Sequence, residues 1–132
     1  MPKFSCSLLV CILGCGVSVP IWASPALYGE SYSQCMDQSE GVTSRMIACI
    51  DTEYQRQDQR LNQHYQQVMS SLSSTQKSQL RTVQRKWLTY RDANCQFYAD
   101  PDGGSLARVE ANACLLRMTA KRAEELAQML SP

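Results

Sequence analysis

The sequence predicts an all-α fold: a small antiparallel bundle of three long helices, preceded by a short N-terminal helical turn and held by two disulfides. Apolar residues recur in steps of three and four through most of the chain after residue 42, which is the spacing of one helix face. Clusters of Ser, Gly and Pro interrupt this pattern at short intervals. The 132 residues allow a single domain.

A secretory signal is predicted over residues 1–23. Lys3 precedes an apolar run at residues 4–19 that is too short to span a bilayer comfortably. Pro20 ends the run, and Ala23 supplies the small residue at which a signal peptidase would cut. We therefore expect an exported protein, periplasmic or secreted, with no integral membrane span in the mature chain.

A lipoprotein signal is the alternative. Residues 12–15 resemble a lipobox, and the mature chain would then be anchored through a lipid on Cys15. The run stays apolar well beyond Cys15, which favours cleavage after Ala23.

Four cysteines remain once the signal is removed: Cys35, Cys49, Cys95 and Cys114. An even number of cysteines in an exported chain indicates two disulfides. Among the three possible pairings, loop closure favours the two local ones, Cys35 with Cys49 and Cys95 with Cys114. Each would stabilise the fold by roughly 3 kcal/mol, because it limits the unfolded chain. No Cys-x-x-Cys pair occurs, so we expect neither a metal nor another cofactor.

The N-terminal part of the mature chain shows little periodicity, and we expect an extended lead-in over residues 24–34. The domain itself is expected over residues 35–130. It would open with a short helical turn that begins at Cys35 and is ended by Gly41.

The first long helix is expected to be capped by Thr43 or Ser44. Its apolar residues fall on one face: Ile47, Ile50, Tyr54, Leu61, Tyr65, Val68 and Leu72. Asp58 lies on the same face between Tyr54 and Leu61, where a carboxylate needs a partner.

The second long helix follows the serine cluster at residues 70–74, where Ser73 and Gln76 are spaced for a capping box. Its expected face comprises Leu80, Val83, Trp87, Tyr90, Asn94 and Phe97. This spacing predicts that Trp87 and Tyr90 pack in the core rather than stack on a sugar.

The strongest helix breaker is the segment at residues 100–104, which combines Pro101 with two glycines. Ser105 is then expected to cap the third long helix. Its apolar face comprises Leu106, Val109, Ala113, Leu116, Ala120, Ala123, Ala127 and Leu130. The alanines on this face would let a neighbouring helix approach closely.

Three charged residues, Asp58, Arg91 and Arg122, each lie on or beside the apolar face of a different long helix. We interpret them as a buried polar network, in which Arg91 or Arg122 partners the Asp58 carboxylate and fixes the helix register. A charged pocket open to solvent is the functional alternative.

The loop formed by Asp100, Asp102, Gly103, Gly104 and Ser105 is the best local candidate for a partner-binding element. An exposed turn beside a disulfide is held rigid and can enter a groove on another protein. A plain connection between two helices is the alternative.

Charge and motifs argue against several function classes. The formal charge is +1, and loss of Lys3 with the signal would bring it to about zero, so no attraction to nucleic acid is expected. A glycosidase needs two carboxylates fixed across a cleft, and no sequence context singles out Glu53, Asp58 or Glu110. No G-x-S-x-G turn is present. We expect a binding protein and not an enzyme.

The chain resembles the family of small exported domains named after the N-terminal domain of the lysozyme inhibitor LprI. The most specific string runs without gaps from Trp87 to Cys95 as Trp-x-x-Tyr-Arg-Asp-Ala-x-Cys. Further matching residues are Ala48, Cys49, Glu53, Tyr54, Asp58, Leu61, Asn62, Tyr65, Gln84, Gly103, Gly104, Ser105, Cys114, Thr119 and Arg122. The resemblance extends from about Cys35 to Leu126.

This resemblance implies an envelope or secreted protein that blocks a muramidase by occluding its cleft, with a lysozyme as the protein partner. The alternative is a structural or interaction domain of the envelope, with an immunity or stress role and no effect on lysozyme.

Overall fold

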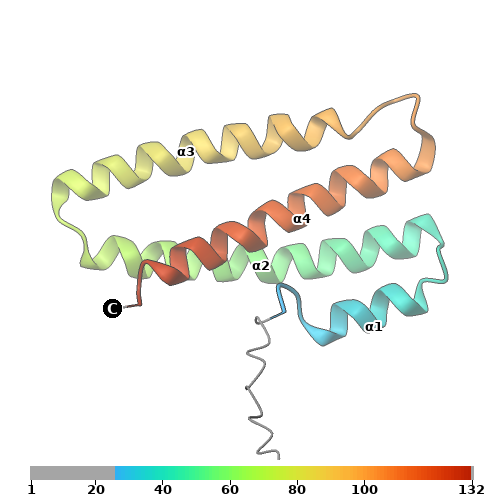
Figure 1. Ribbon diagram of the computed structural model, residues 1–132, viewed down its shortest axis with the longest axis horizontal. Helices are drawn as coiled ribbons and strands as arrows, with labels where there is room; N and C mark the ends of the chain where they lie inside the picture. Colours follow the sequence, from blue (N-terminus) through green and yellow to red (C-terminus); the bar gives the residue numbers. More distant parts are fainter. Residues whose placement is uncertain (1–25, 132) are drawn as a thin grey trace, which may run out of the picture.

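The structure is a computed structural model that describes residues 26–131 and consists of four α-helices (Figure 1). They are α1 (Glu30–Gln38), α2 (Thr43–Ser71), α3 (Ser74–Phe97) and α4 (Gly104–Gln128). No strand occurs among these residues, so the predicted all-α class is confirmed. The predicted signal at residues 1–23 and the alternative anchor at Cys15 lie outside the described part of the chain.

Helix α1 begins earlier than the sequence predicted. Residues 30–34 were expected in the extended lead-in, but the helix already starts at Glu30 and its N-cap is Gly29. The helix ends at Gln38, and the chain then turns through Glu40 and Gly41, both of which have positive φ. Positive φ suits glycine, so the stop predicted at Gly41 has a clear cause.

The starts of the long helices depend on local capping. Ser73 and Gln76 form the predicted capping box, in which each side chain bonds the other residue's backbone N–H. At α2 and α4 the predicted caps are wrong by one or two positions. The N-cap of α2 is Val42 and that of α4 is Gly103, so neither helix start has a side-chain capping hydrogen bond.

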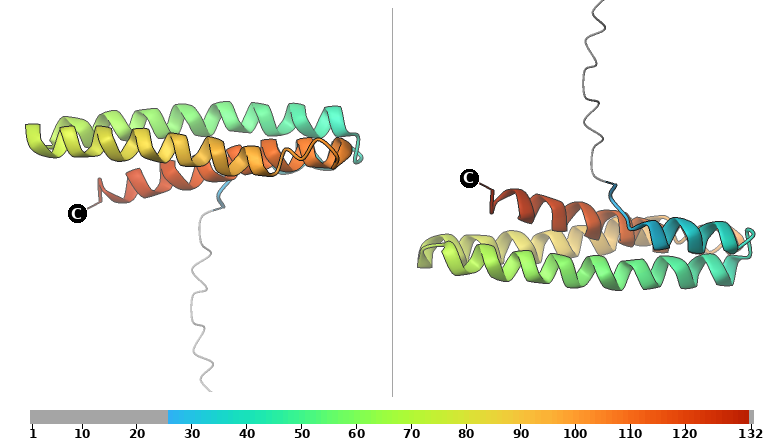
Figure 2. Two further views of the ribbon diagram at one scale, coloured as in Figure 1. Left: turned by 90° about the horizontal axis from the view of Figure 1, so that it is seen from above. Right: turned by 90° about the horizontal axis from the view of Figure 1, so that it is seen from below.

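The three long helices form the bundle, and α1 packs beside the start of α2. Figures 1 and 2 together place α2, α3 and α4 at the corners of a triangle, with α4 crossing the antiparallel pair α2 and α3. Helix α4 packs most extensively against α2, and far less against α3. None of the helices over residues 26–131 is long and apolar enough to cross a membrane.

The core has two parts along the bundle axis. Near the start of α2, Ile50 packs with Val109 and Leu116 of α4. Further along, Leu61 packs with Ala123 and Leu126, beside the partly buried Tyr65 and Trp87. Ala120 and Ala123 are completely buried, as expected where two helix backbones approach closely.

The register of α3 differs from the predicted one. Its buried residues are Leu80, Gln84, Arg91 and Cys95, whereas Val83, Tyr90 and Phe97 are exposed. Trp87 is partly buried, but the expectation that Tyr90 packs in the core is wrong, because 61% of this residue is exposed. The face of α3 toward α4 is largely polar, so apolar spacing alone pointed to the wrong side.

Both predicted disulfides are present. Cys35 bonds Cys49 and joins α1 to α2, with a Cα–Cα distance of 5.7 Å. Cys95 bonds Cys114 and joins α3 to α4, with a Cα–Cα distance of 5.4 Å. Three of the four cysteines are buried, and Cys35 is partly buried.

Candidate functional site

The turn between α3 and α4 has a defined backbone. The Asp100 carboxylate accepts a hydrogen bond from Asp102 N at 2.9 Å, and Asp100 O accepts one from Gly103 N at 3.1 Å. A Cβ on Gly103 would lie 2.7 Å from the Ala107 Cβ, so only glycine fits there. Gly104 has φ +65°, which other residues rarely adopt.

Large apolar side chains surround this turn and point into solvent. Phe97 is 82% exposed and Leu106 is 64% exposed, and Tyr98 packs edge-on against Phe97 with ring centroids 5.7 Å apart. We call these residues and the exposed turn the tip surface: Phe97, Tyr98, Asp100, Asp102, Gly103, Gly104, Ser105 and Leu106. Grouped apolar side chains on a surface commonly mark an interaction site.

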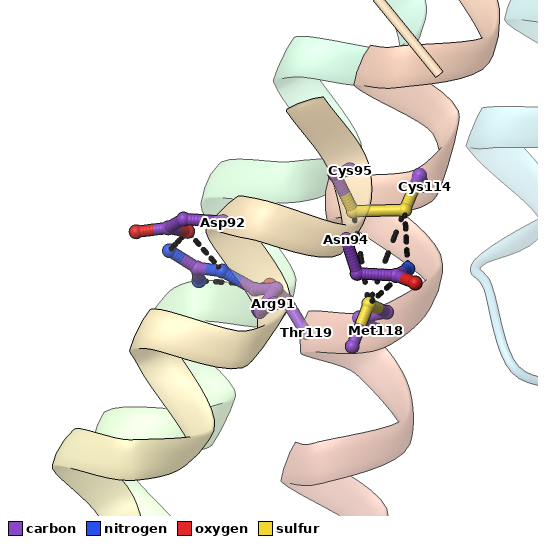
Figure 3. The surroundings of a disulfide bond; sticks show 7 residues. All are labelled: Arg91, Asp92, Asn94, Cys95, Cys114, Met118 and Thr119. Atoms are coloured by element: carbon purple, nitrogen blue, oxygen red, sulfur yellow. Dashed lines mark hydrogen bonds and ion pairs between the residues drawn. A yellow bond between two sulfur atoms is a disulfide. The ribbon is translucent and has the colours of Figure 1, made fainter. Parts of the chain in front are cut away.

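A disulfide fixes the base of the tip surface (Figure 3). Cys95 precedes Phe97 by two residues, and Cys114 lies in the facing part of α4. The Met118 Sδ lies 3.7 Å from the Cys95 Sγ and 3.9 Å from the Cys114 Sγ, and Asn94 Nδ2 approaches the Met118 Sδ at 3.4 Å. The disulfide therefore holds the end of α3 against α4 at Cys114, ten residues after α4 begins.

Arg91 and Arg122 are both buried, and the structure brings them to the same aromatic ring. Their guanidinium carbons lie 5.2 Å and 5.9 Å from the centre of the Trp87 ring, which permits cation–π attraction. Arg91 Nη1 donates to Thr119 Oγ1, as Figure 3 shows, and Arg122 Nε donates to Gln84 Oε1. The network links α3 to α4.

The carboxylates that pair with Arg91 and Arg122 are exposed, and each comes from the same helix as its arginine. Arg91 pairs with Asp92 at 2.8 Å, and Arg122 pairs with Glu125 at 2.8 Å. Asp58 is not part of the network, so the expected partnership of Asp58 with Arg91 or Arg122 is wrong. Asp58 is only partly buried and accepts a hydrogen bond from Asn62, one turn further along α2.

The buried carboxylate of α2 is Glu53, which is 2% exposed. Its Oε1 accepts hydrogen bonds from Gln57 Nε2 at 2.8 Å and from Gly29 N at 3.3 Å. Arg56 Nη1 donates to its other oxygen. Glu53 therefore fastens the segment before α1 onto α2.

The surroundings of Glu53 also affect the pKa values of two neighbouring tyrosines. Burial raises the pKa of the Tyr28 phenol, and the neighbouring Tyr32 and Glu53 add to the rise while Arg117 opposes it. Burial also raises the pKa of Tyr32, with a further contribution from the Glu53 carboxylate. The two rings contact each other edge-on at 5.0 Å. Sequence reasoning missed this cluster, because Tyr28 and Tyr32 fell in the predicted lead-in.

No group of three or more His, Cys, Asp and Glu side chains within residues 26–131 is arranged to hold a metal ion.

The family described as lysozyme inhibitor LprI matches residues 35–126, which is more than half of the chain. The chain belongs to this family.

The residues of the family motif occupy two kinds of position in the structure. Trp87 and Arg91 belong to the buried network, and Cys95 forms the disulfide at the base of the tip surface. Tyr90 and Asp92 are exposed on α3. The motif therefore specifies the contact between α3 and α4, while two of its residues remain exposed to solvent on α3.

Similar chains add little about function. An uncharacterized protein of Rhizobium meliloti (strain 1021) is 29% identical over 96 residues, which cover 62% of this chain and 69% of that protein. No solved structure matches the chain significantly.

Proposed function

We propose that this member of the LprI family is an exported protein that inhibits a lysozyme by stoichiometric occlusion, with the tip surface as its contact element. The observation that carries the proposal is the exposure of Phe97 and Leu106 on the helix ends that flank the turn, where a disulfide joins α3 to α4. The family match to lysozyme inhibitors supplies the class of partner.

The tip surface suits this role better than the helix faces. An apolar anchor that is already held in place binds tightly because little conformational entropy is lost on association. The apolar faces of α2 and α4, in contrast, are occupied by the core. Asp100 and Asp102 add negative charge, which would steer the tip surface toward a basic patch on the enzyme.

The first test is a turbidity assay of lysozyme on cell walls with increasing amounts of the disulfide-bonded protein. If the protein occludes the lysozyme cleft, lysozyme activity should fall in proportion to the amount of protein added until the two proteins are equimolar. The lysozyme itself should remain chemically intact. Phe97→Ser combined with Leu106→Ser should weaken inhibition by at least about 30-fold, the loss typical of a central apolar anchor.

The control is Val83→Ser, because Val83 is an apolar residue 50% exposed on α3 away from the tip surface. The glycines are left intact, since replacing Gly103 or Gly104 would disturb the turn itself. Undiminished inhibition by the double variant would move the contact surface elsewhere. Failure of the unaltered protein to bind any lysozyme would instead favour an envelope interaction domain.

A further inference from the structure

A groove of about 310 Å³ lies between α2 and α3, apart from the tip surface. The residues that line it are Asp58, Leu61, Asn62 and Tyr65 of α2 and Arg81, Gln84, Arg85 and Leu88 of α3. Each helix contributes two turns, so the groove is about 10 Å long. Small-molecule sites start at ~300 Å³, whereas a docked helix of a partner would need a longer groove.

The walls of the groove combine an apolar floor with free hydrogen-bond donors. Leu61 and Leu88 supply the apolar surface. Arg81 and Arg85 are exposed one turn apart, and within residues 26–131 neither makes an ion pair or a side-chain hydrogen bond. Helix α3 has no acidic residue before Asp92, so nothing on this helix neutralises them.

Gln84 lies at the floor with its amide orientation fixed. Arg122 Nε can only donate, so the Gln84 atom that it contacts at 3.1 Å is the oxygen. The amide nitrogen makes no hydrogen bond to any described residue and remains a donor at the groove. The Nη2 of Arg122 is buried and also lacks a partner in this part of the chain, while its Nη1 is paired with Glu125.

Asp58 is the one anionic group among the lining residues, and it already accepts a hydrogen bond from Asn62. Two arginines against one carboxylate leave the groove with a net positive charge. From this balance of donors and charge we infer that the groove binds a small anionic amphiphile, a carboxylate or a phosphate monoester joined to an apolar body about as long as the groove. The arginines hold the anion and the leucines cover the apolar body.

The experiment is an NMR titration of the purified, disulfide-bonded protein with four probes of equal chain length: octanoate, octyl phosphate, octanol and octylammonium. The two anions should bind saturably at millimolar concentration and shift the amides of the lining residues. Octanol and octylammonium should bind at least about tenfold more weakly, because octanol carries no negative charge and the arginines repel octylammonium. Preference for octanoate over octyl phosphate, or the reverse, identifies the headgroup.

Three variants locate the binding site. Arg81→Gln with Arg85→Gln should weaken octanoate binding at least about tenfold. Asp58→Asn should strengthen it by about twofold, because a repulsive charge is removed. The matched control is Lys86→Gln, which removes an exposed positive charge from α3 outside the groove and should change the affinity by less than about twofold.

Three results would overturn the inference. Equal binding of octanol and octanoate would leave the site without anion selectivity. A loss in Lys86→Gln as large as in the arginine variant would mean diffuse attraction to α3. Absence of saturation by either anion at millimolar concentration would mean that the groove binds neither. Circular dichroism of each variant verifies that the helices are retained.

Discussion

Glu53 has a carboxylate that accepts hydrogen bonds from three residues in two parts of the chain, the segment before α1 and α2 itself. It receives hydrogen bonds from the backbone before α1, from Gln57 on its own helix and from Arg56 beside it. A buried carboxylate is costly unless such donors surround it, and here they do. The residue therefore couples the position of the N-terminal segment to the register of α2.

The stability of the protein should depend on Glu53 and hardly at all on Asp58. Glu53→Ala leaves Gln57 and Gly29 without their acceptor, and we expect a loss of about 3 kcal/mol in the free energy of unfolding. Asp58→Ala removes a partly exposed hydrogen bond and should change it by less than about 0.5 kcal/mol. Urea unfolding of both variants measures the difference. Equal losses would contradict the assignment of Glu53 as the structural carboxylate.

The tyrosines beside Glu53 should titrate at unusually alkaline pH. Since their pKa values are raised in the folded state, the stability they contribute is complete below about pH 10 and falls as pH rises through the raised values. Phenolate absorbance should show this late component in the unaltered protein, and Tyr28→Phe with Tyr32→Phe should remove it. Glu53→Gln should move it to lower pH. A titration that Glu53→Gln leaves unchanged would contradict the electrostatic part of the explanation.

At the scale of elements, the sequence predicts the four helical segments and both disulfides, but not which side of α3 faces inward. The predicted and observed faces share Leu80 and the partly buried Trp87 but otherwise differ, because Gln84 and Arg91 occupy buried positions that apolar spacing skips. The disulfide could have corrected the register. Cys95 must face α4, and steps of three and four back from it reach Arg91 and Gln84.

For a related reason, the sequence predicts the wrong buried carboxylate on α2, Asp58 instead of Glu53. Glu53 and Asp58 are five residues apart, so they point about 140° away from each other around the helix. Which of them is buried depends on α1, whose position was not predicted because its first residues resembled an extended lead-in. Since Cys49 faces α1 through the disulfide, Glu53 one turn later faces the same side.

Helix α1 should depend on its disulfide. None of its residues is fully buried, and its packing on the core comes from the partly buried Tyr32 and Met36. Replacing Cys35 and Cys49 by serine should cost roughly 3 kcal/mol in global stability and speed hydrogen exchange in α1, with α2 to α4 remaining helical. The matched control is the Cys95→Ser, Cys114→Ser pair, which should leave α1 protected. Unchanged exchange in α1 after loss of its own bridge would contradict this.

Along its length, the whole molecule has one half that contains both disulfides and one half that contains neither. Both disulfides lie toward the end of the bundle that carries the tip surface, as the positions of α1, the start of α2 and the end of α3 in Figure 1 show. The opposite half, around the turn at residues 72–73, is held by side-chain packing of Leu61, Ala123 and Leu126. The proposed protein contact thus lies on the rigid half, and the groove between α2 and α3 lies on the other.

This division predicts a gradient of hydrogen exchange along α3. Its first half buries only Leu80 and Gln84, whereas its second half is fixed by Cys95 and by the network of Arg91 with Thr119. Amides at residues 74–83 should therefore exchange faster than those at residues 91–97, because their opening requires less of the core to separate. In the Cys95→Ser, Cys114→Ser variant the difference should shrink. Uniform exchange along α3 would mean that the disulfide does not divide the molecule, and the rigidity of the tip surface would then need another source.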